Sequence, residues 1–201
     1  MLYTNHELLP TLESRRVLLR PLERSDIALL EPVALGQPEL FRFMSALIRT
    51  SEELAHFVEQ ALADRVEQRS VPFVVIDKPS GAVAGSTRFG NLDLRHKRVE
   101  IGWTWLDARF HGTGLNKAMK FLMLRYAFEA LELNRVEIKT NEQNTRSRRA
   151  IEAIGGQYEG RFRHHMVNGD GTLRNTIYYS ILKEEWPELK QGVFAEQQGE
   201  L

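Results

Sequence analysis

Cysteine is absent from this sequence of 201 residues. Its absence excludes disulfide bonds, a thiolate nucleophile, cysteine-ligated zinc and iron–sulfur clusters. No apolar run approaches the roughly 20 residues that a membrane-spanning helix needs. The N-terminal segment Met1–Glu7 lacks a basic stretch followed by an apolar one, so we expect no secretory signal. These absences predict a cytoplasmic protein without a membrane partner.

A surplus of charge of either sign is also missing. Lys and Arg number 27, and Asp and Glu also number 27, so the formal net charge is zero. A general nucleic-acid binder needs surplus positive charge, and we therefore expect no nucleic-acid partner. Hydrophobic residues make up 42% and charged residues 27%, which is typical of a globular protein with a buried core.

The sequence contains no repeat, linker or low-complexity segment, and its 7 prolines and 14 glycines do not cluster before the last dozen residues. The length suits one α/β domain. We therefore expect a single domain over residues 1–201, with its core at about 15–187. The tail at about 190–201 is polar and contains glycine, so we expect it to fray.

Hydrophobic periodicity predicts strands and helices in the order β-α-α-β-β-β-α-β-α-β-β. The predicted strands cover 17–20, 73–76, about 82–90, 99–106 and 135–140, with two more on either side of the turn 168–171. The predicted helices start at about 25, 51, 115 and 144. An α/β fold with a mixed sheet flanked by helices follows from this order.

The predicted strand 99–106 has the most regular alternation in the chain. Successive side chains of a strand point to opposite faces, so its residues form two sets. One set is Val99, Ile101, Trp103 and Trp105. The other set is Glu100, Gly102, Thr104 and Leu106.

A Gly-x-Gly loop, Gly112–Gly114, joins this strand to the amphipathic helix that starts at Leu115. Backbone N–H groups at such a junction converge on an anion at the positive end of the helix. The alternative is a tight turn without a ligand. A Walker loop does not fit the spacing, and a dinucleotide fingerprint fails because position 117 is Lys instead of Gly.

Three arginines, Arg146, Arg148 and Arg149, lie in the first turns of the helix that starts near Asn144. Cations there oppose the helix macrodipole and cost up to about 1 kcal/mol each. Departures from local rules are typical of functional sites, so a bound phosphate or other anion is one interpretation. A solvated arginine face is the other, and helix capping alone explains Asn144.

The segments Glu100–Leu106 and Arg109–Gly114 together resemble the acetyl-CoA motif of the GNAT superfamily of N-acetyltransferases, Gln/Arg-x-x-Gly-x-Gly/Ala between a strand and a helix. Thr140–Ser147 resembles the Asn-x-x-Ser element of the branch that includes the ribosomal-protein N-terminal (RimJ/RimL-type) acetyltransferases. The resemblance spans about residues 15–187. It implies a GNAT-like fold with a mixed, mostly antiparallel twisted sheet.

The resemblance implies an enzyme that moves an acetyl group from acetyl-CoA to a primary amine by direct attack, without a metal. A protein N-terminal α-amine is the leading acceptor. The alternatives are a small amine (an amino acid, a polyamine or an aminoglycoside) and a non-catalytic CoA-binding module. The apolar segment Leu40–Met44 is expected in an acceptor pocket, a homodimer contact or the core.

The same resemblance assigns residues to the cofactor. The backbone of Trp105–Ala108 would pair with the pantetheine amides like an added strand. The N–H groups from Arg109 to Gly114 would hold the pyrophosphate, and Leu115–Lys117 at the helix start would add contacts. The expected cofactor-binding residues are Trp105, Leu106, Arg109, Phe110, His111, Gly112, Thr113, Gly114, Leu115, Asn116, Lys117, Asn144 and Ser147.

Two catalytic residues are expected. By family similarity, Ser147 would protonate or hydrogen-bond the departing sulfur; the alternative is a hydroxyl bonded locally within its helix. Glu100 is the first candidate for the base that takes the proton of the amine, and the alternative is a solvated or salt-bridged strand residue. His164 and His165 are further candidates for this base. Adjacent strand residues point to opposite faces, so at most one of the two is well placed. His111 is expected to shape the loop.

Overall fold

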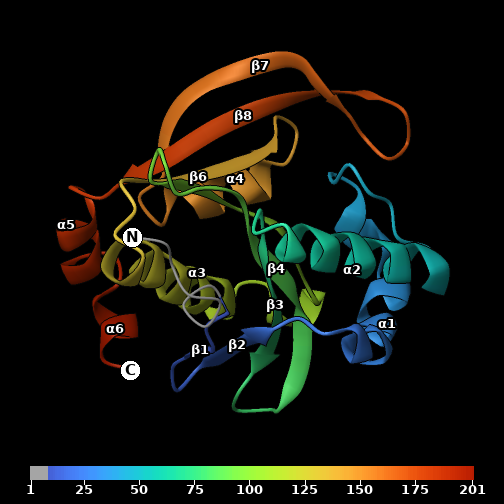
Figure 1. The fold of residues 1–201 in the computed structure, drawn as a ribbon, viewed down its shortest axis with the longest axis horizontal. Helices are drawn as coiled ribbons and strands as arrows, with labels where there is room; N and C mark the ends of the chain where they lie inside the picture. Colours follow the sequence, from blue (N-terminus) through green and yellow to red (C-terminus); the bar gives the residue numbers. More distant parts are fainter. Residues whose placement is uncertain (1–8) are drawn as a thin grey trace.

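The computed structural model describes residues 9–201 and contains one eight-stranded sheet (Figure 1). Its strand order is β1-β2-β3-β4-β5-β6-β8-β7, and every neighbouring pair is antiparallel except β5 and β6. The strands are β1 (Leu12–Glu13), β2 (Val17–Pro21), β3 (Val71–Asp77), β4 (Ala82–Asp93), β5 (Arg98–Leu106), β6 (Arg135–Asn141), β7 (Gln157–Val167) and β8 (Leu173–Leu182). The predicted mixed, mostly antiparallel sheet is confirmed.

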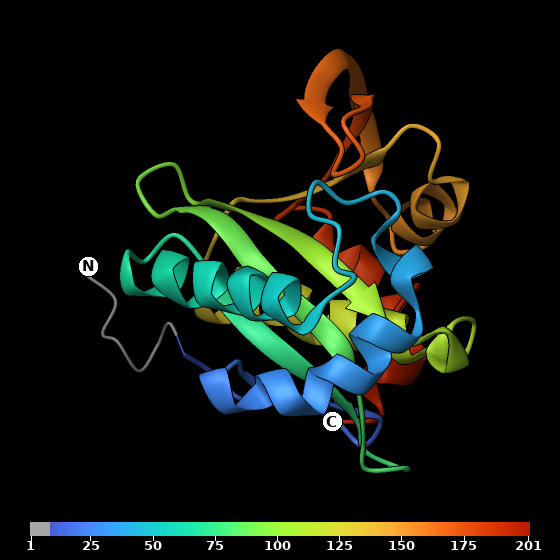
Figure 2. The same ribbon diagram turned by 90° about the vertical axis from the view of Figure 1, so that its right-hand side faces the viewer.

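Helices cover both faces of this sheet (Figure 2). One face carries α1 (Ile27–Gly36) and α2 (Ser51–Val66), which lie side by side. The other face carries α3 (Leu115–Arg125) with its π-helical continuation η4 (Tyr126–Ala130), α4 (Thr145–Glu152), α5 (Trp186–Gln191) and α6 (Ala195–Gln198). Short 3-10 turns are η1 (Arg24–Asp26), η2 (Pro38–Phe41) and η3 (Ala108–Phe110). The predicted element order is confirmed, with β1, α5 and α6 in addition.

Local sequence explains where α2 begins. Thr50 is its N-cap and accepts a hydrogen bond from the Glu53 amide, while the Glu53 side chain accepts from the Thr50 amide. This reciprocal capping box satisfies amides that a helix start leaves free. Leu54, Phe57 and Val58 then form the buried stripe that packs against the sheet.

The C-terminal residues pack instead of fraying. Phe194 is fully buried, with its ring 5.5 Å from that of Phe121 and 5.8 Å from that of Trp186. The Arg15 amide also donates a hydrogen bond of 2.7 Å to the Glu200 carbonyl. The expectation of a frayed tail was therefore wrong, because one buried aromatic ring anchors a segment that is otherwise polar.

A β-bulge changes the faces of β5. Ser86 of β4 lies opposite Trp105 and Arg88 lies opposite Gly102, so β5 carries one extra residue between these pairs. Trp103 takes a left-handed φ of +49° there. A bulge of this kind reverses the alternation that follows it.

The face prediction for β5 is therefore correct up to Gly102 and wrong beyond it. Val99 and Ile101 belong to the main core, on the side of α3, as does Leu106. Trp103 and Trp105 pack instead into the second core, under α1 and α2. Thr104 turns toward α3, where its hydroxyl accepts a hydrogen bond from Lys120.

Within residues 9–201 no helix is long and apolar enough to cross a membrane. The segment Met1–Glu7, for which the sequence predicts no secretory signal, lies outside the described residues.

Candidate active site

A cleft opens where two neighbouring strands of the sheet diverge. β5 and β6 pair only where Arg98–Glu100 faces Arg135–Glu137. Beyond this point the edge of β5 that faces β6 has no strand partner among the described residues. The cleft has a volume of about 770 Å³ and is lined by β5, β6, β8, α3, α4 and the segment before α2.

Four backbone amides of the loop that follows β5 donate hydrogen bonds to acceptors within the same loop. The Arg109 amide donates to Asp107 Oδ1 (2.9 Å) and the Phe110 amide to the Asp107 carbonyl (2.9 Å). The amides of His111 and Thr113 donate to the Ala108 and Phe110 carbonyls. Burial works to raise the pKa of Asp107, but hydrogen bonds from Arg109 and Gln37 outweigh it and lower that pKa to about 2. These four amides are therefore not free for a ligand.

The next amides of the loop are free. Within residues 9–201 no group accepts a hydrogen bond from the amides of Gly112, Gly114, Leu115, Asn116 and Lys117. The last three are the first N–H groups of α3, where the helix dipole favours an anion. Gly112 and Gly114 have φ of +74° and +86°, a left-handed backbone that glycine adopts at little cost. The loop and the start of α3 therefore contain five backbone donors without an internal acceptor.

His111 connects this loop to α4. Its Nδ1 accepts a hydrogen bond from Arg146 Nη1 (2.9 Å), which leaves Nε2 to donate to the Leu106 carbonyl (2.9 Å). Arg146 is thereby held beside the free amides. Arg148 instead donates to the Tyr179 hydroxyl (3.2 Å), and Arg149 is exposed. The arginine cluster thus divides, and only Arg146 lines the cleft.

Asn144 and Ser147 both line the cleft from the start of α4. Asn144 Oδ1 accepts a hydrogen bond from the Ser147 amide (3.1 Å), which is the capping role that needs no ligand. The Ser147 hydroxyl has no hydrogen-bond partner in the part of the chain that the structure describes. It is therefore available to a molecule in the cleft.

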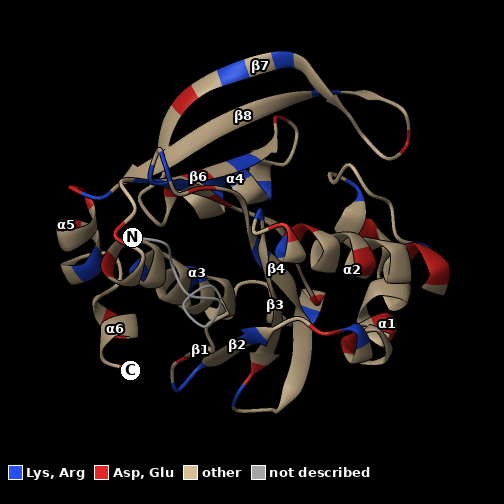
Figure 3. Ribbon diagram, in the orientation of Figure 1, with Lys and Arg blue, Asp and Glu red and all other residues tan. Residues whose placement is uncertain are grey.

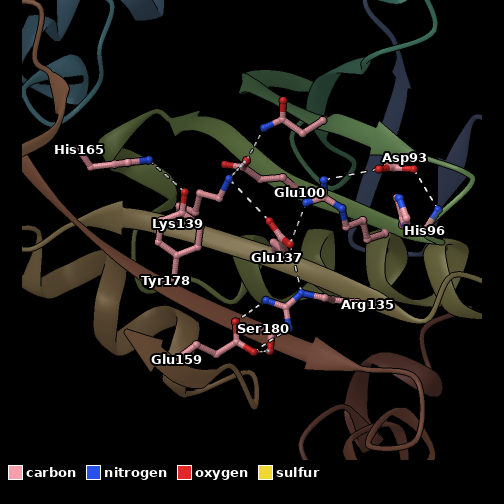
Figure 4. Close-up of polar contacts among 12 residues, drawn as sticks. Asp93, His96, Glu100, Arg135, Glu137, Lys139, Glu159, His165, Tyr178 and Ser180 are labelled. Carbon is pink, nitrogen blue, oxygen red and sulfur yellow. Dashed lines mark hydrogen bonds and ion pairs between the residues drawn. The ribbon is translucent and has the colours of Figure 1, made fainter. Parts of the chain in front are cut away.

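Glu100 lies in β5 at the point where the strands begin to diverge, and it is buried. Its Oε2 accepts hydrogen bonds from Asn91 Nδ2 (2.7 Å) and Lys139 Nζ (2.7 Å), as Figure 4 shows for Lys139. Oε1 has no partner among the described residues, and a Cβ at position 102 would lie only 3.2 Å from it. Gly102 thus leaves room beside a carboxylate that is half paired and half available.

The Glu100–Lys139 pair ends a ladder of charges across β5, β6, β8 and β7 (Figure 4). Lys139 also approaches Glu137 (3.7 Å), whose carboxylate pairs with Arg135, and Arg135 pairs with Glu159 on β7. Burial works to lower the pKa of Lys139, but the negative charge and hydrogen bond of Glu100 outweigh it and raise that pKa. The pairing places a positive charge beside one oxygen of the Glu100 carboxylate.

Lys120 is a cleft residue that the sequence analysis missed. It lies on α3 with 6% of its surface exposed, and Nζ donates to Thr104 Oγ1 (3.2 Å). That hydroxyl is also bonded to Thr87 Oγ1 (2.7 Å). Burial lowers the pKa of Lys120 to about 7. The available signal was a lysine with apolar residues on both sides in a predicted buried helix.

Most of the predicted site residues meet at this cleft. Those that line it are Glu100, Trp105, Leu106, Phe110, His111, Gly112, Gly114, Asn116, Lys117, Asn144 and Ser147. Arg109, Thr113 and Leu115 do not: Arg109 pairs with Asp107 (2.7 Å), Thr113 Oγ1 donates to the Phe110 carbonyl, and Leu115 lies in the main core.

The two adjacent histidines lie at a bulge of β7, where His164 has a left-handed φ of +47°. His165 lines the cleft, where its ring nitrogen lies 3.3 Å from the Tyr178 hydroxyl, and His164 does not line it. In the apolar segment Leu40–Met44, Phe41 is in the second core, while Leu40 and Met44 line the cleft.

Comparison with known proteins shows which family this chain resembles. The sequence model of the acetyltransferase (GNAT) domain matches residues 16–157. YdaF of Bacillus subtilis (strain 168), whose name assigns it provisionally to the ribosomal N-acetyltransferases, is 40% identical over 107 residues, which are 53% of this chain and 57% of that protein. The match thus spans little more than half of that relative's length.

Solved structures agree over nearly the whole chain. A GCN5-related N-acetyltransferase from Brucella melitensis is 30% identical, covers 94% of this chain and 85% of its own, and superposes with a TM-score of 0.86. RimJ of Mycobacterium smegmatis, solved in complex with CoA-disulfide, has the same fold at 23% identity, with 94% of both chains covered and a TM-score of 0.78. The chain therefore belongs to the GNAT family and is an N-acetyltransferase.

Proposed function

We propose that this enzyme transfers the acetyl group of acetyl-CoA to the α-amine at the N-terminus of a peptide or protein. The observation that carries the proposal is the cleft between β5 and β6, which has free backbone donors at one wall and Glu100 and Ser147 in its lining. Direct transfer needs no enzyme nucleophile, which suits a chain without cysteine.

The chain's own residues suit the cofactor. The free amides of Gly112, Gly114 and 115–117 would hold the pyrophosphate. The edge of β5 near Trp105, which has no strand partner on the β6 side among the described residues, would pair with the pantetheine amides. Lys117 and Arg146 add positive charge at the same wall of the cleft. RimJ of M. smegmatis, which has the same fold, holds a CoA-disulfide. Acetyl-CoA supplies the acetyl group as an activated thioester.

Glu100 and Ser147 would carry the proton transfers. Glu100 Oε1 would take a proton from the attacking amine, directly or through a water molecule, while Lys139 and Asn91 hold the other oxygen. The Ser147 hydroxyl would donate a hydrogen bond or a proton to the departing sulfur, because no described residue occupies it.

The charge of the cleft favours a peptide over a polyamine or an aminoglycoside. Glu100 is the one carboxylate among the described lining residues, and Lys139 already pairs with it. The lining residues with basic side chains are Lys117, Lys120, Lys139, Arg146 and Arg174. Figure 3 shows acidic residues along α2, away from β7 and α4, which carry mainly Lys and Arg. A multiply charged cation finds no unpaired acid in this cleft.

An acceptor screen tests the proposal. The protein is incubated with acetyl-CoA and with N-terminal peptides, free amino acids, spermidine or an aminoglycoside, and free thiol is measured. Peptides are expected to release thiol fastest. Fastest release with spermidine would overturn the peptide assignment. Calorimetric binding of CoA without acetylation of any amine would favour a CoA-binding module, and no heat at millimolar CoA would remove the cofactor assignment.

The role of Glu100 has its own test. Glu100→Gln keeps the size of the side chain but removes the base, so kcat is expected to fall by about 10²-fold or more at neutral pH. The affinity for CoA, measured by calorimetry, is expected to stay within about twofold of the original protein. An unchanged kcat would assign Glu100 to the charge ladder alone.

A further inference from the structure

Arg174 of β8 is a buried cation without a carboxylate partner. It lines the cleft with 9% of its surface exposed, and no carboxylate of residues 9–201 lies within ion-pair distance of it. Arg88, the other buried arginine, differs: it approaches Asp64 (3.7 Å) and lies over the rings of Phe57 and Trp103. Burying an unpaired charge is costly, so Arg174 needs a reason to be there.

The donors of Arg174 are only partly used. Its Nε donates to Thr176 Oγ1 (3.1 Å) and its Nη1 to the Phe43 carbonyl (3.3 Å). No acceptor for Nη2 exists among the described residues. A guanidinium has five N–H donors in a planar fork that matches a carboxylate. Burial lowers the pKa of Arg174, while the negative charge of Glu100 acts in the opposite direction.

Arg174 faces the side of the sheet away from α3 and α4. Along β8, Ile177 and Tyr179 point into the main core, so Arg174 and Tyr178 point to the opposite face. Lys139 lies on that face as well, 4.7 Å from the Tyr178 ring centroid. The free amides of α3 and the Ser147 hydroxyl of α4 belong to helices of the other face. Arg174 is thus separate from the wall proposed for the cofactor.

Arg174 also contacts the segment before α2, which borders this side of the cleft. Its bond to the Phe43 carbonyl reaches the segment before α2, and the Gly169 amide of the β7–β8 turn donates to the Met44 carbonyl (3.4 Å). An acceptor that reaches Glu100 from this side therefore passes close to the unused donors of Arg174.

We infer that Arg174 binds a carboxylate that the acceptor carries close to its reactive amine. The inference rests on the proposed transfer to an amine and specifies a second group, a carboxylate, on the acceptor. The amine would meet Glu100 and the carboxylate would meet the fork of Arg174. The carboxylate comes either from an acidic side chain near a peptide N-terminus or from the α-carboxylate of a free amino acid.

Matched acceptors test this inference. One pair of peptides differs only by Asp or Asn at the second position, and a second pair is a free amino acid and its amide. We expect kcat/KM, measured by thiol release, to be at least tenfold higher for the carboxylate member of one pair, mainly through a lower KM. The pair that shows the preference identifies the source of the carboxylate. Equal kcat/KM within both pairs would overturn the inference but not the transfer to an amine.

Variants separate binding from a structural role. Arg174→Gln is expected to abolish the preference, so that kcat/KM becomes equal within each pair, and Arg174→Lys is expected to retain part of the preference. Arg163→Gln, which removes an exposed arginine of β7 outside the cleft, is the matched control and should change nothing. An equal loss for both members of a pair would assign Arg174 to folding.

A binding measurement covers the remaining outcomes. Calorimetry on the original protein loaded with CoA compares the Asp and Asn peptides and the amino acid with its amide, without relying on turnover or on a folded variant. At least tenfold tighter binding of one carboxylate member supports the role of Arg174 even if no amine is acetylated, in which case only the proposed transfer fails. Equal binding within both pairs overturns the inference.

Discussion

At the scale of single residues, two polar side chains of the cleft have one hydrogen-bond partner or none among the described residues. The Ser147 hydroxyl has no hydrogen-bond partner among the described residues, although its amide caps α4 through Asn144. Lys120 carries an amine into the interior, where one threonine hydroxyl contacts it. Each feature leads to a measurable consequence.

Ser147→Ala is expected to lower kcat at least tenfold, because a donor to the departing sulfur is lost. Its free energy of unfolding should change by less than about 0.5 kcal/mol, since the hydroxyl makes no internal bond. Ser180→Ala is the control, because the Ser180 hydroxyl donates to Glu159 (2.8 Å) away from the cleft. This control should lose stability and keep kcat; loss of stability in Ser147→Ala would point to a structural hydroxyl instead.

Lys120 makes stability depend on pH. Burial lowers its pKa in the folded protein to about 7, below the ordinary 10.5. Between these values the unfolded chain binds more protons, so the free energy of unfolding rises with pH, by at most about 1.4 kcal/mol per unit. Lys120→Met should remove this rise and be more stable at pH 7. Urea unfolding from pH 6 to 9 measures the free energy of unfolding, and Lys183→Met, at an exposed lysine, is the control. Equal dependence of this free energy on pH in the original protein and both variants would contradict the prediction.

At the scale of elements, the loop between β5 and α3 depends on its backbone more than on its side chains. Gly114 has a left-handed φ of +86° and open space around the position of a Cβ. The left-handed backbone conformation therefore favours glycine at this position, and no close neighbour requires it.

Gly114→Ala is expected to lower the affinity for CoA about tenfold, because the strained residue shifts the free amides that follow it. It should also lower the free energy of unfolding by about 1 kcal/mol. Gly36→Ala at the end of α1 is the control, since no positive φ or close neighbour restricts that position. CoA affinity unchanged in Gly114→Ala by calorimetry would argue against this loop as the phosphate site.

At the scale of the whole molecule, the C-terminal segment completes the main core. Phe194 lies among the rings of Phe121 and Trp186 and is fully buried. Phe194→Ala is therefore expected to lower the free energy of unfolding by about 3–5 kcal/mol. Leu29→Ala, at a side chain that is 51% exposed, should change it by less than about 0.5 kcal/mol. Urea unfolding compares them, and equal stability of both variants would mean that the tail is dispensable.

The sequence was sufficient to predict the seven longer strands, the helices α1 to α4, their order, the Gly-x-Gly loop and the cap of α4, because each depends on residues within a short window. Tertiary structure alone decided which amides stay free, how the bulge at Trp103 turns the two tryptophans to the opposite face, and that Phe194 anchors the tail. It also decided that Glu100 pairs with Lys139, while Arg174 has no carboxylate partner among the described residues. Such contacts join residues far apart in the chain, and local patterns do not encode the packing that brings them together.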